Sequence, residues 1–327
     1  MQDIQLGTSG LWAPQLGFGC SALMGRSGRT ASLRALAAAW DEGIRFFDTA
    51  RSYGYGESEA LLGEFLQGRR SDAIIATKFG IVADRQSSWK RAAKAIARSI
   101  ITVVPSAQSM IQRGASSQFT HNQFTIPILQ QSIEESLRKL RTDCVDMLFM
   151  HAAPASVLEQ DDLLVAIGKL VTAGKVKIAG LSAEPEVVAL ATEQKTRLLK
   201  AMQFPCNVFN VSSAADIARR TGDAYTWVAN NPYGGVARVK RCRELLLELV
   251  QSQKLDQVLC EKLGSLEDNI FADIVLNVIL RESGIHVVIP AMMRVDHIRA
   301  NVQALSHSRF TTNEITHIRR ALTNSVA

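Results

Sequence analysis

A repeated pattern of short apolar segments, each followed by a stretch with helical spacing, constrains this chain more than any other feature. Strands that are apolar on both faces and are joined by helices are typical of parallel sheets. Eight such units within 327 residues predict a closed (β/α)8 TIM barrel of the α/β class rather than an open sheet. The expected strands are Leu16–Gly19, Ile44–Phe47, Ala73–Thr77, Val145–Met150, Val176–Leu181, Met202–Phe204, Ala224–Val228 and His286–Pro290.

The two ends of the chain lie outside this repeat, and both fit a single domain over residues 1–327. Ile4–Leu6 and Leu11–Ala13 flank the turn sequence Gly-Thr-Ser-Gly and predict an N-terminal hairpin. A C-terminal tail and helix is expected over residues 303–327, because Thr311 and Glu314 have the spacing of a capping box.

A long insertion loop, residues 79–126, is expected after the third strand. Within it, Trp89–Ile100 has apolar residues at helical spacing with basic residues between them. We interpret this stretch as an insertion helix on the barrel rim; a basic lid or a helix on a membrane surface is the alternative. Ser106–Gln123 is rich in Ser, Gln and Asn, and we expect it to be disordered and mobile.

Composition narrows the possible partners and compartments. The 37 basic and 31 acidic residues are dispersed and give a net charge of +6, which suits an anionic small molecule and argues against nucleic acid. Five cysteines lack metal or Cys-x-x-Cys spacing and predict free thiols in a reducing compartment. The first residues do not resemble a signal peptide, and no run of 18 uncharged apolar residues occurs, so we expect a cytoplasmic protein without a membrane span.

Four polar residues stand at or just beyond the ends of neighbouring expected strands. Asp48 follows the second strand and Tyr53 lies in the loop after it, while Lys78 follows the third strand and His151 the fourth. Each residue alone also fits an ordinary structural role. Because the carboxyl ends of parallel strands meet on one face of a barrel, however, we expect the four side chains to lie together.

These four residue types suit carbonyl reduction. A hydride adds to the carbonyl carbon, and Tyr53 gives a proton to the oxygen. A free phenol has a pKa of about 10, and an ammonium on Lys78 would lower it by stabilising the phenolate. Asp48 would keep Lys78 charged, and His151 would donate a hydrogen bond to the carbonyl oxygen. Since no side chain supplies a hydride, the chemistry implies a nicotinamide cofactor.

Over nearly its whole length the chain resembles the aldo-keto reductase family. The resemblance rests on Gln15-Leu16-Gly17-Phe18-Gly19-Cys20, Gly43-Ile44-Arg45-Phe46-Phe47-Asp48-Thr49-Ala50, Tyr53-Gly54, Thr77-Lys78, Asp146-Met147-Leu148-Phe149-Met150-His151 and Ile289-Pro290. It implies a (β/α)8 barrel, an NADP(H) cofactor with NAD(H) possible, and an aldehyde, ketone or sugar as the small-molecule substrate. All four members of the family's catalytic tetrad are present.

The resemblance also assigns residues to the nicotinamide end of the cofactor. Ser182 and Gln203 match the polar residues that hold the carboxamide. The asparagine that usually follows the serine is Ala183 here, and the aromatic residue usually stacked under the nicotinamide is Asn230.

The seventh loop, which begins at Asn230, is otherwise similar to the family. It continues through Pro232, and its Gly234 and Gly235 would let the backbone approach the pyrophosphate.

The eighth loop departs most from the family pattern. By spacing, Ala291 replaces a lysine and His297 an arginine of NADPH-preferring members, while Asn301 matches the asparagine that contacts adenine. Arg294 would reach the 2′-phosphate from a shifted position, or it is an ordinary surface arginine. These departures predict weak discrimination between NADPH and NADH, with NADPH preferred.

Three functions are compatible with a barrel of this kind. The leading hypothesis is an NAD(P)(H)-dependent oxidoreductase. A nucleotide-binding regulatory or scaffold protein with little turnover is the alternative, because a fold does not fix its function. A metal-dependent hydrolase is disfavoured, because the sequence has neither a clustered His/Asp ligand set nor zinc spacing, and we expect no metal.

Overall fold

The chain forms a barrel whose strands follow one another around the ring in the order of the sequence. The computed structural model describes residues 1, 3–25, 27–83, 119–194, 198–252, 254–264 and 266–324. Within these ranges, eight parallel strands form one sheet with neighbours in the order β12-β11-β10-β9-β8-β5-β4-β3. They are β3 (Gly17–Gly19), β4 (Phe46–Asp48), β5 (Ile74–Phe79), β8 (Val145–His151), β9 (Val176–Ser182), β10 (Leu199–Pro205), β11 (Thr226–Asn230) and β12 (Val287–Ile289).

The first and last strands of this sheet are joined, so the ring closes. The Val288 N–H donates to Gln15 O (2.9 Å), and the Gly19 N–H donates to Pro290 O (3.0 Å). Leu16 and Val288 also form a parallel bridge. The predicted (β/α)8 barrel is therefore confirmed, and the expected strands differ from the observed ones by a few residues at their ends.

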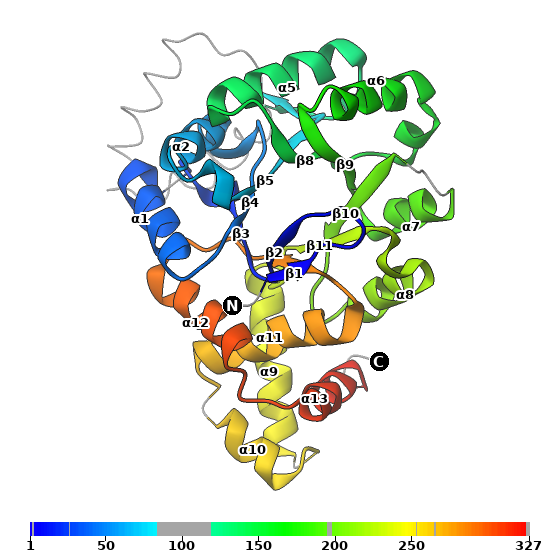
Figure 1. Ribbon diagram of the computed structural model, residues 1–327. Coiled ribbons are helices and arrows are strands. Elements are labelled where there is room, and N and C mark those ends of the chain that lie inside the picture. The colour runs from blue at the N-terminus through cyan, green and yellow to red at the C-terminus, as the bar shows by residue number, and fades with distance from the viewer. Residues whose placement is uncertain are drawn as a thin grey trace.

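Helices on the outside of the ring connect successive strands (Figure 1). The apolar face of α5 shows why these segments are helical: Leu129, Ile133, Leu137 and Leu140 recur at a spacing of three to four residues, and all are buried. The helices between β3 and β11 in the described ranges are α1 (Gly28–Asp41), α2 (Ser58–Phe65), α5 (Ile126–Leu140), α6 (Asp161–Thr172), α7 (Pro185–Glu193) and α8 (Val211–Thr221).

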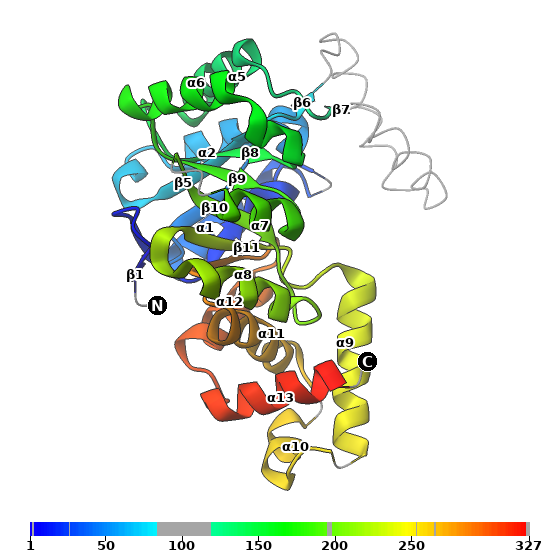
Figure 2. The same cartoon turned by 90° about the vertical axis from the view of Figure 1, so that its right-hand side faces the viewer.

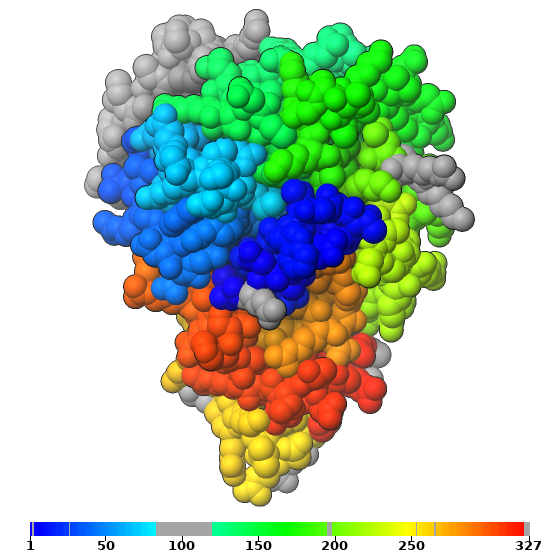
Figure 3. All heavy atoms as spheres, in the orientation of Figure 1, coloured from blue at the N-terminus to red at the C-terminus, as the bar shows by residue number. Residues whose placement is uncertain are grey.

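The predicted N-terminal hairpin is present and closes the amino-terminal end of the barrel. Its strands, β1 (Asp3–Gln5) and β2 (Trp12–Pro14), pair antiparallel. Leu6 and Leu11 pack in one buried cluster with inward-facing residues of the barrel such as Phe46 and Met147. Figures 1 and 3 show the hairpin, in dark blue, lying across the end of the ring that faces the viewer. The functional site therefore has to lie at the opposite end.

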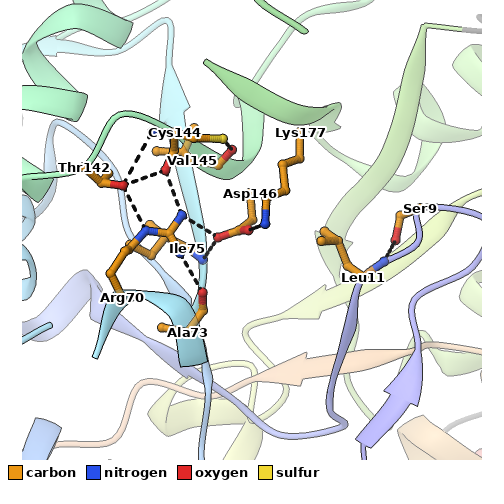
Figure 4. A network of polar contacts seen from close by, with 10 residues as sticks. All are labelled: Ser9, Leu11, Arg70, Ala73, Ile75, Thr142, Cys144, Val145, Asp146 and Lys177. Carbon is orange, nitrogen blue, oxygen red and sulfur yellow. Dashed lines mark hydrogen bonds and ion pairs between the residues drawn. The ribbon is translucent and has the colours of Figure 1, made fainter. Parts of the chain in front are cut away.

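A polar network at this amino-terminal end ties β5, β8 and β9 together (Figure 4). The carboxylate of Asp146, which is 1% exposed, accepts hydrogen bonds from Arg70 Nη2 (2.9 Å) and Ile75 N (2.9 Å). Lys177 Nζ lies 2.7 Å from the same carboxylate. Arg70 also donates to the carbonyl of Cys144 (2.7 Å). Because polar groups at this end of a TIM barrel lie far from the chemistry, we assign the network to stability.

The connection from β11 to β12 contains three helices, whereas the repeat of strand and helix predicted one. They are α9 (Val236–Gln251), α10 (Gln257–Leu263) and α11 (Asp268–Ser283). In Figure 2, α9 and α10 project away from the strands together with α13. After β12 the chain forms α12 (Val295–Ser306) and α13 (Thr312–Asn324). The expected tail from residue 303 is therefore wrong for its first four residues, which belong to α12.

The capping box predicted near the C-terminus is confirmed. The Thr311 N–H donates to Glu314 Oε2 (2.7 Å), and the Glu314 N–H donates to Thr311 Oγ1 (3.3 Å). These reciprocal bonds satisfy donors that the first turn of α13 would otherwise leave without partners.

The insertion after β5 starts and ends in a short antiparallel pair, β6 (Val82–Ala83) and β7 (Phe119–Thr120). The expected helix at Trp89–Ile100 lies outside the described residues, as does residue range 106–118 of the expected disordered segment. Residues 119–123 contribute β7 and a bond from the Gln123 N–H to Gly80 O (2.9 Å), so the prediction of disorder does not hold for them.

The cysteines agree with the prediction of free thiols. All five cysteines are free thiols, of which Cys144 and Cys260 are partly exposed. In the described ranges, none of the helices combines the length and the apolar composition that a membrane span requires.

Candidate active site

Three adjacent strands bring the predicted polar residues together at the carboxyl end of the barrel. Asp48 is the last residue of β4, Lys78 is the fifth of six residues in β5, and His151 is the last residue of β8. Tyr53 begins a short 3-10 turn (Tyr53–Gly56) in the loop after β4. The expectation that these four residues share one face of the barrel is confirmed by their contacts.

Lys78 is the centre of the site. Its side chain is 1% exposed, and the three hydrogens of the ammonium match three acceptors. These are Asp48 Oδ2 at 2.6 Å, the Thr49 carbonyl at 2.9 Å and the Tyr53 hydroxyl at 3.2 Å. Burial lowers the pKa of Lys78, but Asp48 and Tyr53 outweigh this, so the pKa lies above its usual value and the group is a cation at neutral pH.

The Tyr53 hydroxyl is a weaker acid than the sequence predicted. Burial raises the pKa of Tyr53, and Lys78 lowers it through its charge and its hydrogen bond. The effect of Lys78 has the expected sign, but the pKa remains above its usual value because burial and the Asp48 carboxylate act in the opposite direction. The phenol is therefore protonated at neutral pH and can act as a proton donor.

His151 faces Tyr53 and is neutral. The two rings meet edge to face, with their centroids 5.7 Å apart. Burial lowers the pKa of His151 to about 3, and the charges of Lys78 and His121 contribute to the shift. A neutral imidazole has one N–H to donate, so His151 can offer a hydrogen bond without competing for the Tyr53 proton.

Ser182 and Gln203 continue the same network onto the next two strands. Ser182 ends β9 and Gln203 lies in β10, and both side chains are buried. The Ser182 hydroxyl donates to Gln203 Oε1 (2.7 Å), and Gln203 Nε2 donates to Asp48 Oδ1 (2.9 Å). Both oxygens of Asp48 are thus engaged, and the expected carboxamide-binding pair is connected directly to the Asp48–Lys78 ion pair.

The seventh loop has the open backbone that a phosphate group needs. Asn230 ends β11 and is partly exposed, and Pro232 is buried behind it. Gly234 and Gly235 have φ of 68° and 87°, and a Cβ on Gly235 would meet no atom within 4 Å. The loop leads directly into α9, whose N-terminal N–H groups favour an anion. This geometry fits the expected approach of the backbone to a pyrophosphate.

The eighth loop and α12 form one wall of a cavity of about 720 Å³. Arg294 lies in this wall and is paired with Asp296 through two hydrogen bonds, one of them 3.0 Å from Nε to Oδ1. His297 is not among the residues that line the cavity, and its Nε2 lies 3.8 Å from Asp268 Oδ2. The structure therefore brings Arg294 to the cavity but not His297.

Asn301 is buried beside the seventh loop, so only part of its side chain is available to a ligand. Its Oδ1 accepts a hydrogen bond from the Tyr233 hydroxyl (2.5 Å). Tyr233 also stacks on Phe271 of α11, with ring centroids 6.1 Å apart. A contact from Asn301 to a bound adenine would use the amide nitrogen or the second lone pair of Oδ1. The carboxamide pair, the glycine loop and the arginine-lined cavity each have the chemistry that one part of a nicotinamide dinucleotide needs, although none of Asp48, Tyr53, Lys78 and His151 lines the cavity.

Comparison with known proteins agrees with this geometry. The family model described as "Aldo/keto reductase family" matches residues 15–323. The chain belongs to the aldo/keto reductase family. The structure of aldo-keto reductase AKR11C1 from Bacillus halodurans in its holo form superposes with a TM-score of 0.72 and 21% identity, covering 98% of this chain and 96% of that one. At this identity the superposition shows the shared barrel fold.

Two curated relatives match this chain over part of their length. Aldo-keto reductase YhdN from Bacillus subtilis (strain 168) is 25% identical over 215 residues, which are 64% of this chain and 55% of YhdN. D-threo-aldose 1-dehydrogenase from Pseudomonas sp is 29% identical over 210 residues, which are 59% of this chain and 55% of that protein. The chain thus spans about half the length of these relatives in the matches.

Several contacts of this family member could not be assigned from its sequence. The carbonyl of Thr49 is a partner of Lys78, but a backbone acceptor carries no sequence signal. Tyr233 and Asp296 lie inside the two loops that the sequence had singled out, and only the fold shows which residues they bind. Among the described residues, no cluster of three or more His, Cys, Asp or Glu side chains is arranged to hold a metal ion.

Proposed function

We propose that this protein is an NAD(P)(H)-dependent oxidoreductase that interconverts aldehydes, ketones or sugars with alcohols, with Tyr53 as the general acid and base. The observation that carries the proposal is the buried ammonium of Lys78, which bonds the Tyr53 hydroxyl and the Asp48 carboxylate at once. Membership of the aldo/keto reductase family and the name of the aldose dehydrogenase relative support the reaction class.

Each member of the site has one task in this scheme. When bound, a nicotinamide cofactor supplies the hydride in reduction and accepts it in oxidation. The Tyr53 hydroxyl gives its proton to the carbonyl oxygen as negative charge develops there, and the Lys78 ammonium stabilises the resulting phenolate. Asp48 balances the charge of Lys78 and fixes its position. The neutral His151 donates an N–H to the same carbonyl oxygen and holds the substrate.

Ser182 and Gln203 hold the carboxamide of the cofactor, and Asn230, Pro232 and Gly234 shape the seventh loop around it. Because Gln203 also bonds Asp48, the position of the cofactor and the position of Lys78 are coupled through one carboxylate. We expect this coupling to keep the nicotinamide close to the proton donor.

NADP(H) is the cofactor that we propose, with NAD(H) also accepted. Arg294 and Arg299 line the cavity next to α12 and can attract a 2′-phosphate. Arg294 is held by Asp296 and Arg299 by Glu42, with Arg299 Nε 3.0 Å from Glu42 Oε1. The phosphate would have to compete with both carboxylates, which supports weak discrimination. The free thiols support the reducing, cytoplasmic setting expected from the sequence.

The proposal is tested by removing one hydroxyl. In Tyr53→Phe we expect carbonyl reduction to fall by about 10²–10⁴-fold, while the dissociation constant of the cofactor, followed by nicotinamide fluorescence, changes little. Tyr225→Phe is the matched control, because it removes a phenol hydroxyl immediately before β11, at the amino-terminal end of the barrel. Its turnover should equal that of the wild type.

Two outcomes would contradict the proposal. Wild-type turnover in Tyr53→Phe would remove this residue from the mechanism. If NADPH and NADH bind to the wild-type protein but no aldehyde, ketone or sugar from a broad panel is reduced, the regulatory or scaffold alternative is favoured.

A further inference from the structure

The loop that carries Tyr53, residues 50–56, adopts a conformation that its own sequence does not favour. Gly54 and Tyr55 both have left-handed φ values, of 58° and 57°. Glycine accepts such a value, but a tyrosine rarely does. Gly54 also approaches Leu23 closely, and a Cβ at Gly54 would lie 2.5 Å from the Leu23 carbonyl oxygen. Contacts from outside the loop are needed to hold it in this shape.

Helix α5 supplies such contacts on both sides of Tyr53. Two residues before it, Arg51 Nη1 donates to Ser132 Oγ (3.0 Å), and Arg51 Nη2 pairs with Glu135. Three residues after it, the Gly56 carbonyl accepts from Lys139 Nζ (2.8 Å). The loop is thus attached to one helix at two points that flank the proton donor.

Glu135 joins these two attachments. One of its oxygens pairs with Arg51, and the other lies 3.0 Å from Lys139 Nζ. The three side chains are mostly buried, with 14% of Arg51, 17% of Lys139 and 29% of Glu135 exposed. Ion pairs of this kind have well-defined geometry, unlike exposed surface pairs.

The helix itself is a firm support, because it packs closely on α2. A Cβ on Gly63 of α2 would lie 2.4 Å from the Lys139 carbonyl, so the two helix backbones are in contact at this point. At its start, α5 is capped by Thr125, whose hydroxyl accepts from the Ile128 N–H (3.4 Å). A displacement of Glu135 relative to the barrel would have to disturb this packing.

The bond that the loop determines is the one from Lys78 to Tyr53. The other two partners of Lys78 are fixed by the sheet. Asp48 ends β4, and the N–H of Thr49, the next residue, donates to Ala76 O in β5 (2.8 Å). The Tyr53 hydroxyl lies at 3.2 Å, the longest of the three distances, and its position depends on the loop. A small shift of the loop would weaken this bond and leave the Asp48–Lys78 pair intact.

We propose that Glu135 is a positioning residue for the reaction: by holding Arg51 and Lys139 together, it keeps the Tyr53 hydroxyl within hydrogen-bond reach of Lys78. This inference rests on the proposed role of Tyr53 as the proton donor. It assigns Glu135 no contact with substrate or cofactor, and it predicts that loss of its charge alters proton transfer without altering cofactor binding.

The test compares two neighbouring glutamates of α5. Glu135→Gln removes the charge that holds Arg51 and Lys139, whereas Glu134→Gln removes the exposed pair between Glu134 and Lys175. In Glu135→Gln we expect the kcat of carbonyl reduction to fall about 10- to 100-fold, with the dissociation constants of NADPH and NADH within about twofold of the wild type. Glu134→Gln should match the wild type in each measurement.

The pH profile separates positioning from general destabilisation. Reduction requires the protonated phenol, so kcat falls as the pH rises through the pKa of Tyr53. A weaker bond from Lys78 removes an effect that lowers this pKa, so the alkaline limb should move to higher pH in Glu135→Gln and stay in place in Glu134→Gln. Among the residues that the structure describes, the charged and titratable groups that face Tyr53 are Lys78, Asp48, Cys20 and His151, and none of them changes in either variant.

Two further variants make the outcomes decisive. In a Tyr53→Phe background, adding Glu135→Gln should lower the residual kcat no further, because the positioned group is already gone. If Tyr53→Phe is inactive but Glu135→Gln has the kcat and pH profile of the wild type, the inference is overturned and the proposed function stands. If Glu135→Gln does not fold, Arg51→Lys decides, since one ammonium cannot bond Ser132 and Glu135 in the same way; a wild-type kcat and pH profile there would likewise overturn the inference.

Discussion

Replacing Lys78 by methionine tests the electrostatics of the site most directly. Lys78 and Asp48 form a buried ion pair with side chains 1% and 6% exposed. In Lys78→Met, Asp48 keeps the Gln203 amide as a donor but loses its countercharge. Removing one partner of a buried pair typically destabilises a protein by about 3–5 kcal/mol. We expect a loss of this size in the free energy of unfolding, measured by urea denaturation.

A double variant separates the cost of the unpaired charge from the cost of lost packing. Asp48→Asn combined with Lys78→Met leaves no buried charge at this position. We expect it to be more stable than Lys78→Met alone, with a coupling energy of about 0.5–3 kcal/mol. If the double variant is instead less stable by the sum of the single effects, the unpaired Asp48 carboxylate is not the cause of the destabilisation.

Catalysis should respond through the pKa of Tyr53. Burial and Asp48 raise this pKa, and Lys78 lowers it. In Lys78→Met these two effects that raise the pKa remain, and the main effect that lowers it is lost. The alkaline limb of kcat/KM for reduction should move to higher pH, and turnover at neutral pH should fall by about 10²–10⁴-fold. A folded variant, judged by circular dichroism, with normal turnover and an unshifted limb would refute the reasoning.

Three further predictions concern other parts of the molecule. Burial raises the pKa of Glu59, although hydrogen bonds from Ser136 and Thr77 act in the opposite direction. The protonated Glu59 therefore contributes fully to stability below the pKa that it has in the unfolded chain. This contribution is lost as the pH rises through the pKa that Glu59 has in the folded protein. The stability of Glu59→Gln relative to the wild type, measured by urea denaturation, should therefore increase as the pH rises above the usual pKa of a glutamate, and a difference independent of pH would contradict this. Asp146→Ala leaves the Ile75 N–H without its acceptor and should cost about 1–3 kcal/mol in urea denaturation with an unchanged kcat, because Asp146 lies at the end of the barrel opposite the site. Asp296→Asn frees Arg294 and should strengthen NADPH binding more than NADH binding in fluorescence titrations; equal changes for the two cofactors, or the same result in an Arg294→Ala background, would show that Arg294 does not meet the 2′-phosphate.

The sequence by itself determined the barrel and the identity of the polar residues at its carboxyl end. Strand and helix periodicity are local properties, and eight repeats of one pattern allow few arrangements other than a closed ring. Asp48, Lys78 and His151 could be identified because each stands where an apolar run stops. The capping box at Thr311 is local in the same sense, since both partners lie within one helical turn.

Tertiary structure decided how these residues act on one another. The bond from Gln203 to Asp48 joins positions 155 residues apart, and the pair of Arg51 and Glu135 joins positions 84 residues apart, so neither leaves a periodic signal. The sequence predicted that Lys78 lowers the pKa of Tyr53, but the raised value depends on burial by surrounding segments of the chain. Helices α9 and α10 were missed for a related reason. A long connection between two strands can form one helix or several, and the number depends on how the connection packs. Desolvation and long-range pairing are properties of the assembled barrel, and for that reason only the folded chain fixes them.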